Sequence, residues 1–166
     1  DEDLSAALYE TTQTVPEGAG FEAYEVSNHA RGVAARSAHN LHVWRGGDYL
    51  GLGPGAHGRL TLDGTRTATV AHRGIGDYLA GVEADAPWSE RTGLPAAEAA
   101  EERILLGLRT VEGVGMEDLA RLGLSASEGP LADLVTEGFL RVDRARLIAT
   151  SRGRPVLDGV LRSLLT

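Results

Sequence analysis

The side chains that could do chemistry concentrate in one segment of twenty residues, positions 39–58, which reads HNLHVWRGGDYLGLGPGAHG. His39 opens the segment, and a neutral imidazole on a partly exposed turn can bind the iron of a heme through one ring nitrogen while a neighbouring acceptor fixes the other. Trp44 could cover the face of a porphyrin, and Asn40 could orient the ring or a propionate. A lone histidine is also commonly a surface or capping residue, so these residues alone leave both interpretations open.

Two other patterns in this segment suggest sites that the surrounding sequence disfavours. His39 and His42 are three residues apart and could share a zinc ion on a helix, but no sequence neighbour offers the one or two further ligands that zinc needs. Positions 53–58 satisfy G-x-G-x-x-G, yet a threonine-rich hairpin follows where a dinucleotide site would need a helix N-terminus. The glycines instead predict backbone bending close to a cofactor.

The remaining titratable residues of the first half lack such a context. Glu22 and Glu25 lie in a pattern that alternates apolar and acidic residues. Without a partner acid or base, this pattern favours a solvated or barrel-facing strand over a catalytic carboxylate pair. His29 and His72 belong to no motif and are expected to be structural.

Composition bounds the class of protein. The 166 residues carry a net charge of −8, are 42% hydrophobic and include no cysteine. This apolar content is enough for a core in one ordinary domain or two small ones. The acidity argues against nucleic-acid binding, and the missing cysteines exclude disulfides, thiolate-bound zinc and a cluster held by the chain itself. No apolar run approaches the roughly 20 residues needed to span a membrane, and no signal peptide is recognisable, so we expect a cytoplasmic protein with at most peripheral membrane association.

The first half of the chain predicts mixed helices and strands. The patterns indicate a helix at 3–14, a strand at 21–26, a loop at 31–38, a helical turn at 39–45, a short strand at 48–52, a hairpin at 59–70, a helix at 74–84 and a linker at 87–93. Alternating threonines flank Asp63-Gly64, a pair favoured where both turn residues need positive φ. Pro16 is expected to stop the first helix, and the linker is the expected domain boundary.

The second half predicts a small winged-helix-like domain. A helix is expected after Pro95, because apolar residues recur at spacings of three and four up to Val111. Further elements are expected as helices at 116–122 and 128–137, strands at 139–142 and 146–149, and a closing helix with apolar ridges. Pro155 leaves the start of that last helix open, since it cannot donate a backbone hydrogen bond.

Two segments resemble the HemW-type heme chaperones, a radical-SAM family described as oxygen-independent coproporphyrinogen III oxidase-like. Positions 39–58 match the family pattern HN-x-x-Y-W followed by GDY-x-G-x-G-x-GAHG, except that Val43 stands where tyrosine is usual. Positions 24–30, YEVSNHA, resemble the family's strand end YE-[IV]-S-N-x-A. The HN-x-x-x-W segment is the family's proposed heme-binding motif, so the resemblance implies a heme site on His39, Asn40 and Trp44, with His39 as the iron ligand.

The resemblance implies an α+β fragment of a longer protein. Residues 1–60 would be the end of a radical-SAM partial (β/α) barrel, 61–90 a hairpin, short helix and linker, and 91–166 the winged-helix-like domain. The intact protein would bind a [4Fe-4S] cluster, S-adenosylmethionine and heme, and would pass heme to acceptor hemoproteins. Ala30 and His57 match positions that contact S-adenosylmethionine in related oxidases. The fragment itself would have no catalytic residues, and homo-oligomer formation stays open.

Two alternatives belong to other functional classes. The parent could be an oxygen-independent coproporphyrinogen III oxidase that decarboxylates its substrate with a 5′-deoxyadenosyl radical, although those enzymes lack the HN-x-x-x-W segment. Residues 91–166 could instead be a winged-helix module that binds DNA or protein. Arg141, Arg144 and Arg146 would then contact phosphates, but nearby acidic residues favour a solvated face of mixed charge.

Overall fold

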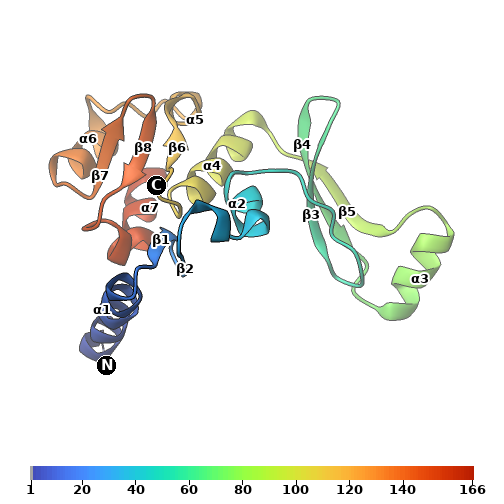
Figure 1. Cartoon of the computed structure of the whole chain (residues 1–166). Coiled ribbons are helices and arrows are strands. Elements are labelled where there is room, and N and C mark those ends of the chain that lie inside the picture. Colours follow the sequence, from blue (N-terminus) through green and yellow to red (C-terminus); the bar gives the residue numbers. More distant parts are fainter. Residues whose placement is uncertain (1) are drawn as a thin grey trace.

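The computed structural model describes residues 2–166, which form a mixed α+β structure (Figure 1). Helix α1 (Glu2–Gly18) leads into strands β1 (Glu22–Glu25) and β2 (Asn28–Ala30), which pair with each other antiparallel. The first helix is longer than expected: Pro16 lies inside its last turn, where the lost backbone donor removes only one of the final hydrogen bonds. The expected strand at 21–26 is confirmed as β1, and its partner β2 was not predicted.

A short helix follows the first hairpin. Residues 31–38, expected as a loop, include the 3₁₀ turn η1 (Val33–Ala35), and the predicted helical turn is confirmed as α2 (Ala38–Trp44). The predicted strand at 48–52 is wrong, because only Tyr49 forms a β-bridge there, with Arg59. Glycines interrupt this segment, and they disfavour an extended strand.

The second sheet has three antiparallel strands in the order β3-β4-β5, with the bounds β3 (His57–Leu62), β4 (Thr65–Ala71) and β5 (Trp88–Gly93). The predicted hairpin is confirmed, and its turn residues have positive φ, 49° at Asp63 and 76° at Gly64. Helix α3 (Ile75–Glu83) is confirmed as well. The linker predicted at 87–93 is wrong: these residues form β5, which pairs with the otherwise free edge of β4. Their polar sequence resembles a loop, but their backbone completes the sheet.

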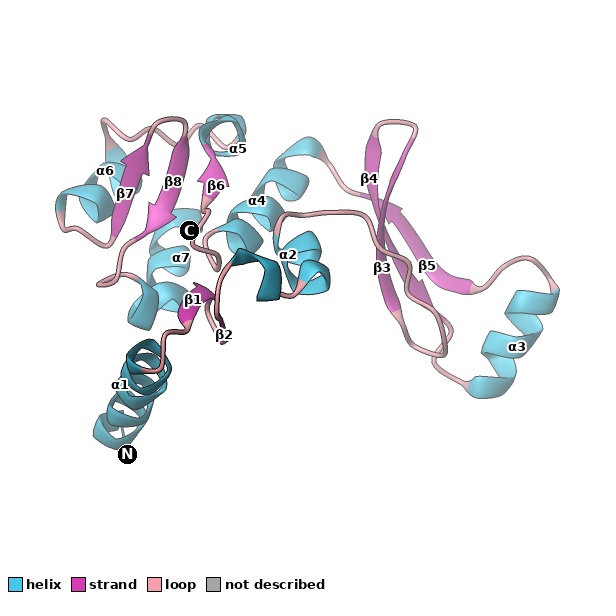
Figure 2. Ribbon diagram, viewed as in Figure 1, coloured by secondary structure: helices cyan, strands magenta, loops and turns pink. Residues whose placement is uncertain are grey.

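The C-terminal half packs helices around a small sheet in the order β6-β8-β7 (Figure 2). Its elements are α4 (Ala96–Gly107), β6 (Val114–Gly115), α5 (Met116–Arg121), α6 (Gly129–Thr136), β7 (Leu140–Asp143), β8 (Arg146–Ala149), η2 (Arg154–Val156) and α7 (Leu157–Leu165). The predicted helices and the β7-β8 hairpin are confirmed, while the two-residue strand β6 was not predicted. Pro155 lies in the 3₁₀ turn, so α7 begins after it.

The described residues form two hydrophobic cores. The larger lies in the C-terminal half and includes Ile104, Leu119, Leu131, Leu147 and Leu161, all nearly inaccessible to solvent. The smaller consists of Tyr24, Ala30 and Leu41 and joins the first hairpin to α2.

The sheets of residues 2–166 have two or three strands, all paired antiparallel, and they form no barrel. The α+β class is therefore confirmed. The sheet β3-β4-β5, called the hairpin sheet below, projects away from the C-terminal half together with α3. Helix α2 lies between the hairpin sheet and the C-terminal half (Figure 1). None of the helices is long and apolar enough to cross a membrane over the described residues.

Candidate functional site

Helix α2 carries the three residues predicted to bind heme. Ser37 caps this helix, because its side-chain oxygen accepts a hydrogen bond from the backbone nitrogen of Asn40 at 3.2 Å. Ser37 is in turn anchored to the smaller core, since its backbone nitrogen donates a hydrogen bond to the hydroxyl of buried Tyr24 at 3.2 Å. His39 is exposed in the first turn, whereas Asn40 and Trp44 are half-buried. The imidazole is therefore accessible from solvent on a helix that is anchored at its start.

The three residues line one small cavity. Its volume is about 230 Å³, and its walls are formed by Glu25, Ser27, Asn28, His39, Asn40, Val43 and Trp44. The cavity lies between α2 and the turn that joins β1 to β2. Val43, which replaces the usual tyrosine of the resembling family, also faces it. The structure thus brings together all three predicted heme contacts, eleven or more positions after the residues that supply the opposite wall.

A buried carboxylate forms part of the opposite wall. Glu25 is 1% exposed, and its carboxylate oxygens accept hydrogen bonds from the Ser27 backbone nitrogen at 3.2 Å and from the Asn28 side-chain nitrogen. Glu25 is therefore not solvated, and these donors compensate its burial, while the barrel-facing alternative stays a prediction for the intact protein. The signal available in the sequence was a serine and an asparagine two and three residues after the glutamate.

The other histidines lie elsewhere. A ring nitrogen of His42 is 2.7 Å from the backbone oxygen of Asp48, so His42 supports the loop after α2 instead of facing the cavity. Within residues 2–166, no group of three or more potential ligands could hold a metal ion. The structure therefore offers no zinc site on His39 and His42. His29 contacts Gln13, as a structural histidine would.

The two residues matched to S-adenosylmethionine contacts are not brought together. Ala30 is buried in β2, whereas His57 is exposed at the start of β3, in a different sheet (Figure 1). Neither lines the cavity at His39. These residues do not form a nucleoside site within this chain.

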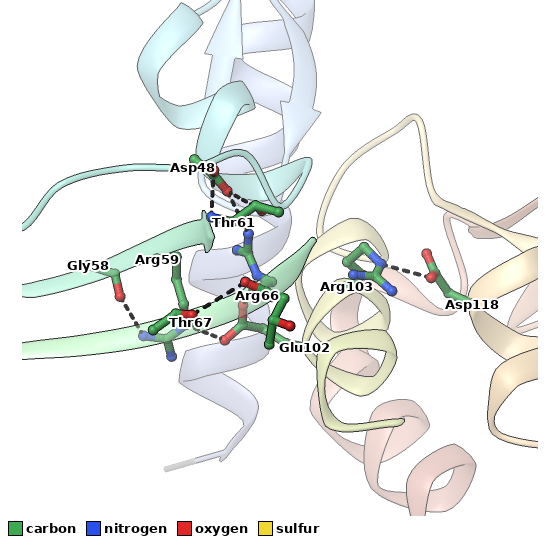
Figure 3. A network of polar contacts seen from close by, with 10 residues as sticks. Asp48, Gly58, Arg59, Thr61, Arg66, Thr67, Glu102, Arg103 and Asp118 are labelled. Atoms are coloured by element: carbon green, nitrogen blue, oxygen red, sulfur yellow. Dashed lines mark hydrogen bonds and ion pairs between the residues drawn. The ribbon is translucent and has the colours of Figure 1, made fainter. Parts of the chain in front are cut away.

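A polar network fixes the hairpin sheet to α4 and to the loop after α2 (Figure 3). Glu102 accepts hydrogen bonds from Arg59 at 2.7 Å and Arg66 at 2.9 Å. Arg66 also contacts Asp48, which accepts from the backbone nitrogen of Thr61 at 2.7 Å. Burial acts to raise the pKa of Glu102, but the two guanidinium hydrogen bonds outweigh it and hold the pKa below its usual value. This network orients the Gly-Asp-Tyr loop relative to β3, β4 and α4.

The end of α2 is held by an ion pair. Arg45, its C-cap, donates to the Glu112 carboxylate with Nε at 2.8 Å and with Nη2. The hydrogen bond from Arg45 lowers the pKa of Glu112. This contact joins α2 to the loop between α4 and β6, so both ends of the helix are fixed.

Two of the three wing arginines, Arg141 and Arg146, make contacts within the chain. Arg141 pairs with Asp143 at 3.0 Å, and Arg146 donates to the backbone oxygens of Glu112 and Gly113 at 2.6 and 2.7 Å. Helix α6, which would be the recognition helix of a winged-helix module, reads GPLADLVT and has no basic residue. These contacts agree with a face of mixed charge and give no support to a DNA-binding surface.

Comparison with known proteins finds relatives that match nearly the whole chain. The chain is 37% identical over 166 residues to the heme chaperone HemW of Mycobacterium tuberculosis H37Rv, covering 99% of this chain and 40% of the chaperone. Over this length it is homologous to the C-terminal part of the HemW heme chaperones. It is also 34% identical over 177 residues to the mouse "Radical S-adenosyl methionine domain-containing protein 1, mitochondrial", again covering 40% of that protein. The chain thus spans about 40% of the length of these HemW-like relatives and corresponds to their C-terminal part.

Residues 94–156 match the family described as HemN C-terminal domain. A solved structure with this fold, described as "Coproporphyrinogen III oxidase (HemN) from Escherichia coli is a Radical SAM enzyme", aligns with 95% of this chain and 40% of that chain at a TM-score of 0.63 and 15% identity. The likeness to HemN shows a shared fold. The residues that match this domain lie within the half for which the sequence predicts a winged-helix-like arrangement.

Proposed function

We propose that this chain carries the heme-binding site of a HemW-like protein, and that the intact protein delivers heme to acceptor hemoproteins. His39 binds the iron, Trp44 covers part of one porphyrin face, and Asn40 orients the ring. The observation that supports the proposal is that all three side chains line the same cavity, with the imidazole exposed. An accessible imidazole beside a half-buried indole suits a flat, apolar ligand with a central metal.

The size of the cavity favours a carrier over a tight resident site. Pockets that enclose a small molecule measure roughly 300–1,000 Å³, and this cavity is about 230 Å³. Heme would place only an edge inside it, while most of the porphyrin would lie on the surface. Surface binding leaves the ligand open to capture by an acceptor, as delivery requires.

We further propose that residues 1–60 complete a partial (β/α) barrel of the longer protein and that the winged-helix-like domain expected at 91–166 follows strand β5, so that the segment 61–90 supplies the hairpin and α3 but no linker. Helix α1 supports this, because Leu4, Leu8 and Val15 are more than half exposed and would be covered by neighbouring barrel elements. The iron–sulfur cluster needs thiolates that this cysteine-free chain does not supply. Ala30 and His57 do not form a site for S-adenosylmethionine here, so no step involving the nucleoside is derived.

Imidazole rescue in the intact protein tests this proposal. His39→Gly removes the ligand and leaves a gap, so the low-spin Soret spectrum should be lost and should return when free imidazole is added. His42→Gly, whose ring contacts the Asp48 carbonyl, is the matched control and should keep the spectrum. A His39→Gly protein that retains the low-spin spectrum without imidazole would contradict the proposal.

A further inference from the structure

Trp44 separates two neighbouring cavities. Besides the first cavity at His39, it lines a second one of about 410 Å³ between α2, α4 and α5. The two cavities are adjacent across a backbone bridge as well, since Glu25 lines the first, Thr110 lines the second, and these residues pair in a β-bridge. A ligand that lies over Trp44 can therefore reach both.

The second cavity is lined by three guanidinium groups that keep free donors. Arg103 uses its Nε for Asp118 at 2.8 Å, Arg45 uses Nε and Nη2 for Glu112, and Arg146 uses Nε and Nη2 for backbone oxygens. Because a guanidinium carries five N–H donors, each retains some that these contacts do not use. Their partners fix the planes of the groups, which prepares them for a carboxylate.

Acidic residues also line this cavity, and their contacts decide whether an anion is tolerated. Glu112 is paired with Arg45, and Asp118 receives hydrogen bonds from both Arg103 and Arg121. The carboxylate of Glu117 also belongs to the lining. Since two of the three acids are already neutralised by arginine, the unused N–H donors remain the groups best placed to meet an added carboxylate.

The first cavity is unsuited to an anion. Its wall contains the carboxylate of Glu25, 1% exposed and with its oxygens already accepting hydrogen bonds. A second carboxylate beside it would be repelled in a poorly solvated place. A heme bound at His39 would thus direct an uncharged edge toward Glu25 and its propionates to the other side.

The length of α2 matches that orientation. Arg45 follows His39 by six residues, which corresponds to about 9 Å along the helix axis. A porphyrin whose iron lies near His39 and whose face covers Trp44 extends in this direction toward the second cavity. The propionates, at its rim, would meet Arg45 and Arg103.

We propose that the second cavity is the propionate-binding subsite of the heme site, with Arg103 and Arg45 as its donors. This inference rests on the proposed heme binding at His39. It makes the site selective for a dicarboxylate porphyrin, and it orients the porphyrin so that one edge faces Glu25 while the charged edge faces the arginines.

A comparison of heme with heme dimethyl ester tests the subsite. Both are titrated into the intact protein and followed at the Soret band, with His39→Ala as the test of iron ligation. We expect the wild-type protein to bind heme about tenfold more tightly than the ester, as the loss of a charge-assisted hydrogen bond implies. Arg103→Gln should weaken the binding of heme about tenfold and leave the affinity for the ester unchanged.

Arg121→Gln is the matched control, because Arg121 donates to the same Asp118 oxygen at 2.7 Å without lining the cavity. It should leave the affinities for heme and ester as in the wild type, and thermal unfolding of both variants verifies that they fold. Equal binding of heme and ester, with His39→Ala still abolishing ligation, would overturn the propionate subsite alone. Absence of His39-dependent binding would overturn the proposed function and the subsite together.

Discussion

Arg66 in β4 donates from Nε to the Glu102 carboxylate in α4 at 2.9 Å, and its own side chain is only 8% exposed. Glu102 also accepts a hydrogen bond from Arg59 in β3. One carboxylate thus connects two strands of the hairpin sheet to α4, the first helix of the region that matches the HemN C-terminal domain (Figure 3). Glu102 therefore joins the sheet to α4, while Asp48 joins the same sheet to the loop after α2.

Glu102→Gln should destabilise the fold by about 1.5–3 kcal/mol, because two charge-assisted hydrogen bonds lose their ionised acceptor and Arg66 stays buried. The free energy of unfolding in urea measures this. Asp143→Asn is the control, since the Arg141–Asp143 pair is about half exposed on both sides and should contribute less than about 1 kcal/mol. Equal losses in the two variants would contradict the role assigned to Glu102.

The same contacts predict how stability depends on pH. Hydrogen bonds from arginine hold the folded-state pKa values of Glu102 and Glu112 below normal, against the opposing effect of burial. A carboxyl whose folded pKa is depressed stabilises the fold above its unfolded pKa of about 4.3, and this contribution is lost as pH falls through the folded value. Stability should therefore fall below about pH 4, and less steeply in Glu102→Gln. Identical acid profiles of the two proteins between about pH 5 and about pH 2 would refute this.

Two glycines with the same backbone conformation should respond differently to alanine. Gly113 has φ 68° and Gly123 has φ 71°. A Cβ at Gly113 would clash with the backbone carbonyl of Leu147, whereas one at Gly123 would have no described heavy atom within 4 Å. We expect Gly123→Ala to cost about 1–2 kcal/mol from left-handed strain alone, and Gly113→Ala to cost clearly more. Thermal unfolding that ranks the two in the opposite order would contradict the packing described for β6 and β8.

The chain should not assemble an iron–sulfur cluster. It contains no cysteine, and such clusters are held by thiolates. After anaerobic reconstitution with iron and sulfide, the purified chain should show no cluster absorbance and should not cleave S-adenosylmethionine. Formation of one cluster per chain would mean that ligands other than cysteine support it.

The local pattern of the sequence predicted most helices and the two hairpins with tight turns. The turn at Asp63-Gly64 was predicted correctly because both residues adopt positive φ. The closing helix was predicted correctly because its apolar ridges are buried. Strand β5 was not predicted, because residues 88–93 are mostly polar and form a strand only by pairing with the edge of β4. The strand predicted at 48–52 is absent although its local pattern favours one, because its glycines prevent continuous pairing.

The candidate site was only half predictable. Asn40 and Trp44 are four residues apart on α2, so their common face follows from sequence spacing, whereas the position of His39 at the same cavity does not. The opposite wall, with Glu25 and Asn28, comes from a separate hairpin. The arginines of the second cavity come from the end of α2, from α4 and from β8. No local pattern connects these residues, because long-range packing of α2 against α4 and the β1-β2 turn creates both cavities.

The most direct test of the account is a heme titration of the intact protein and three histidine variants, followed at the Soret band. His39→Ala should abolish the low-spin heme spectrum, because one coordinate bond determines specific capture. His42→Ala and His72→Ala should leave it largely intact, since neither ring lines the cavity. Trp44→Ala should weaken binding without changing the ligation state, because it removes contact area and no ligand. Equal spectral loss in all three histidine variants would show non-specific adsorption of heme and would contradict the heme site.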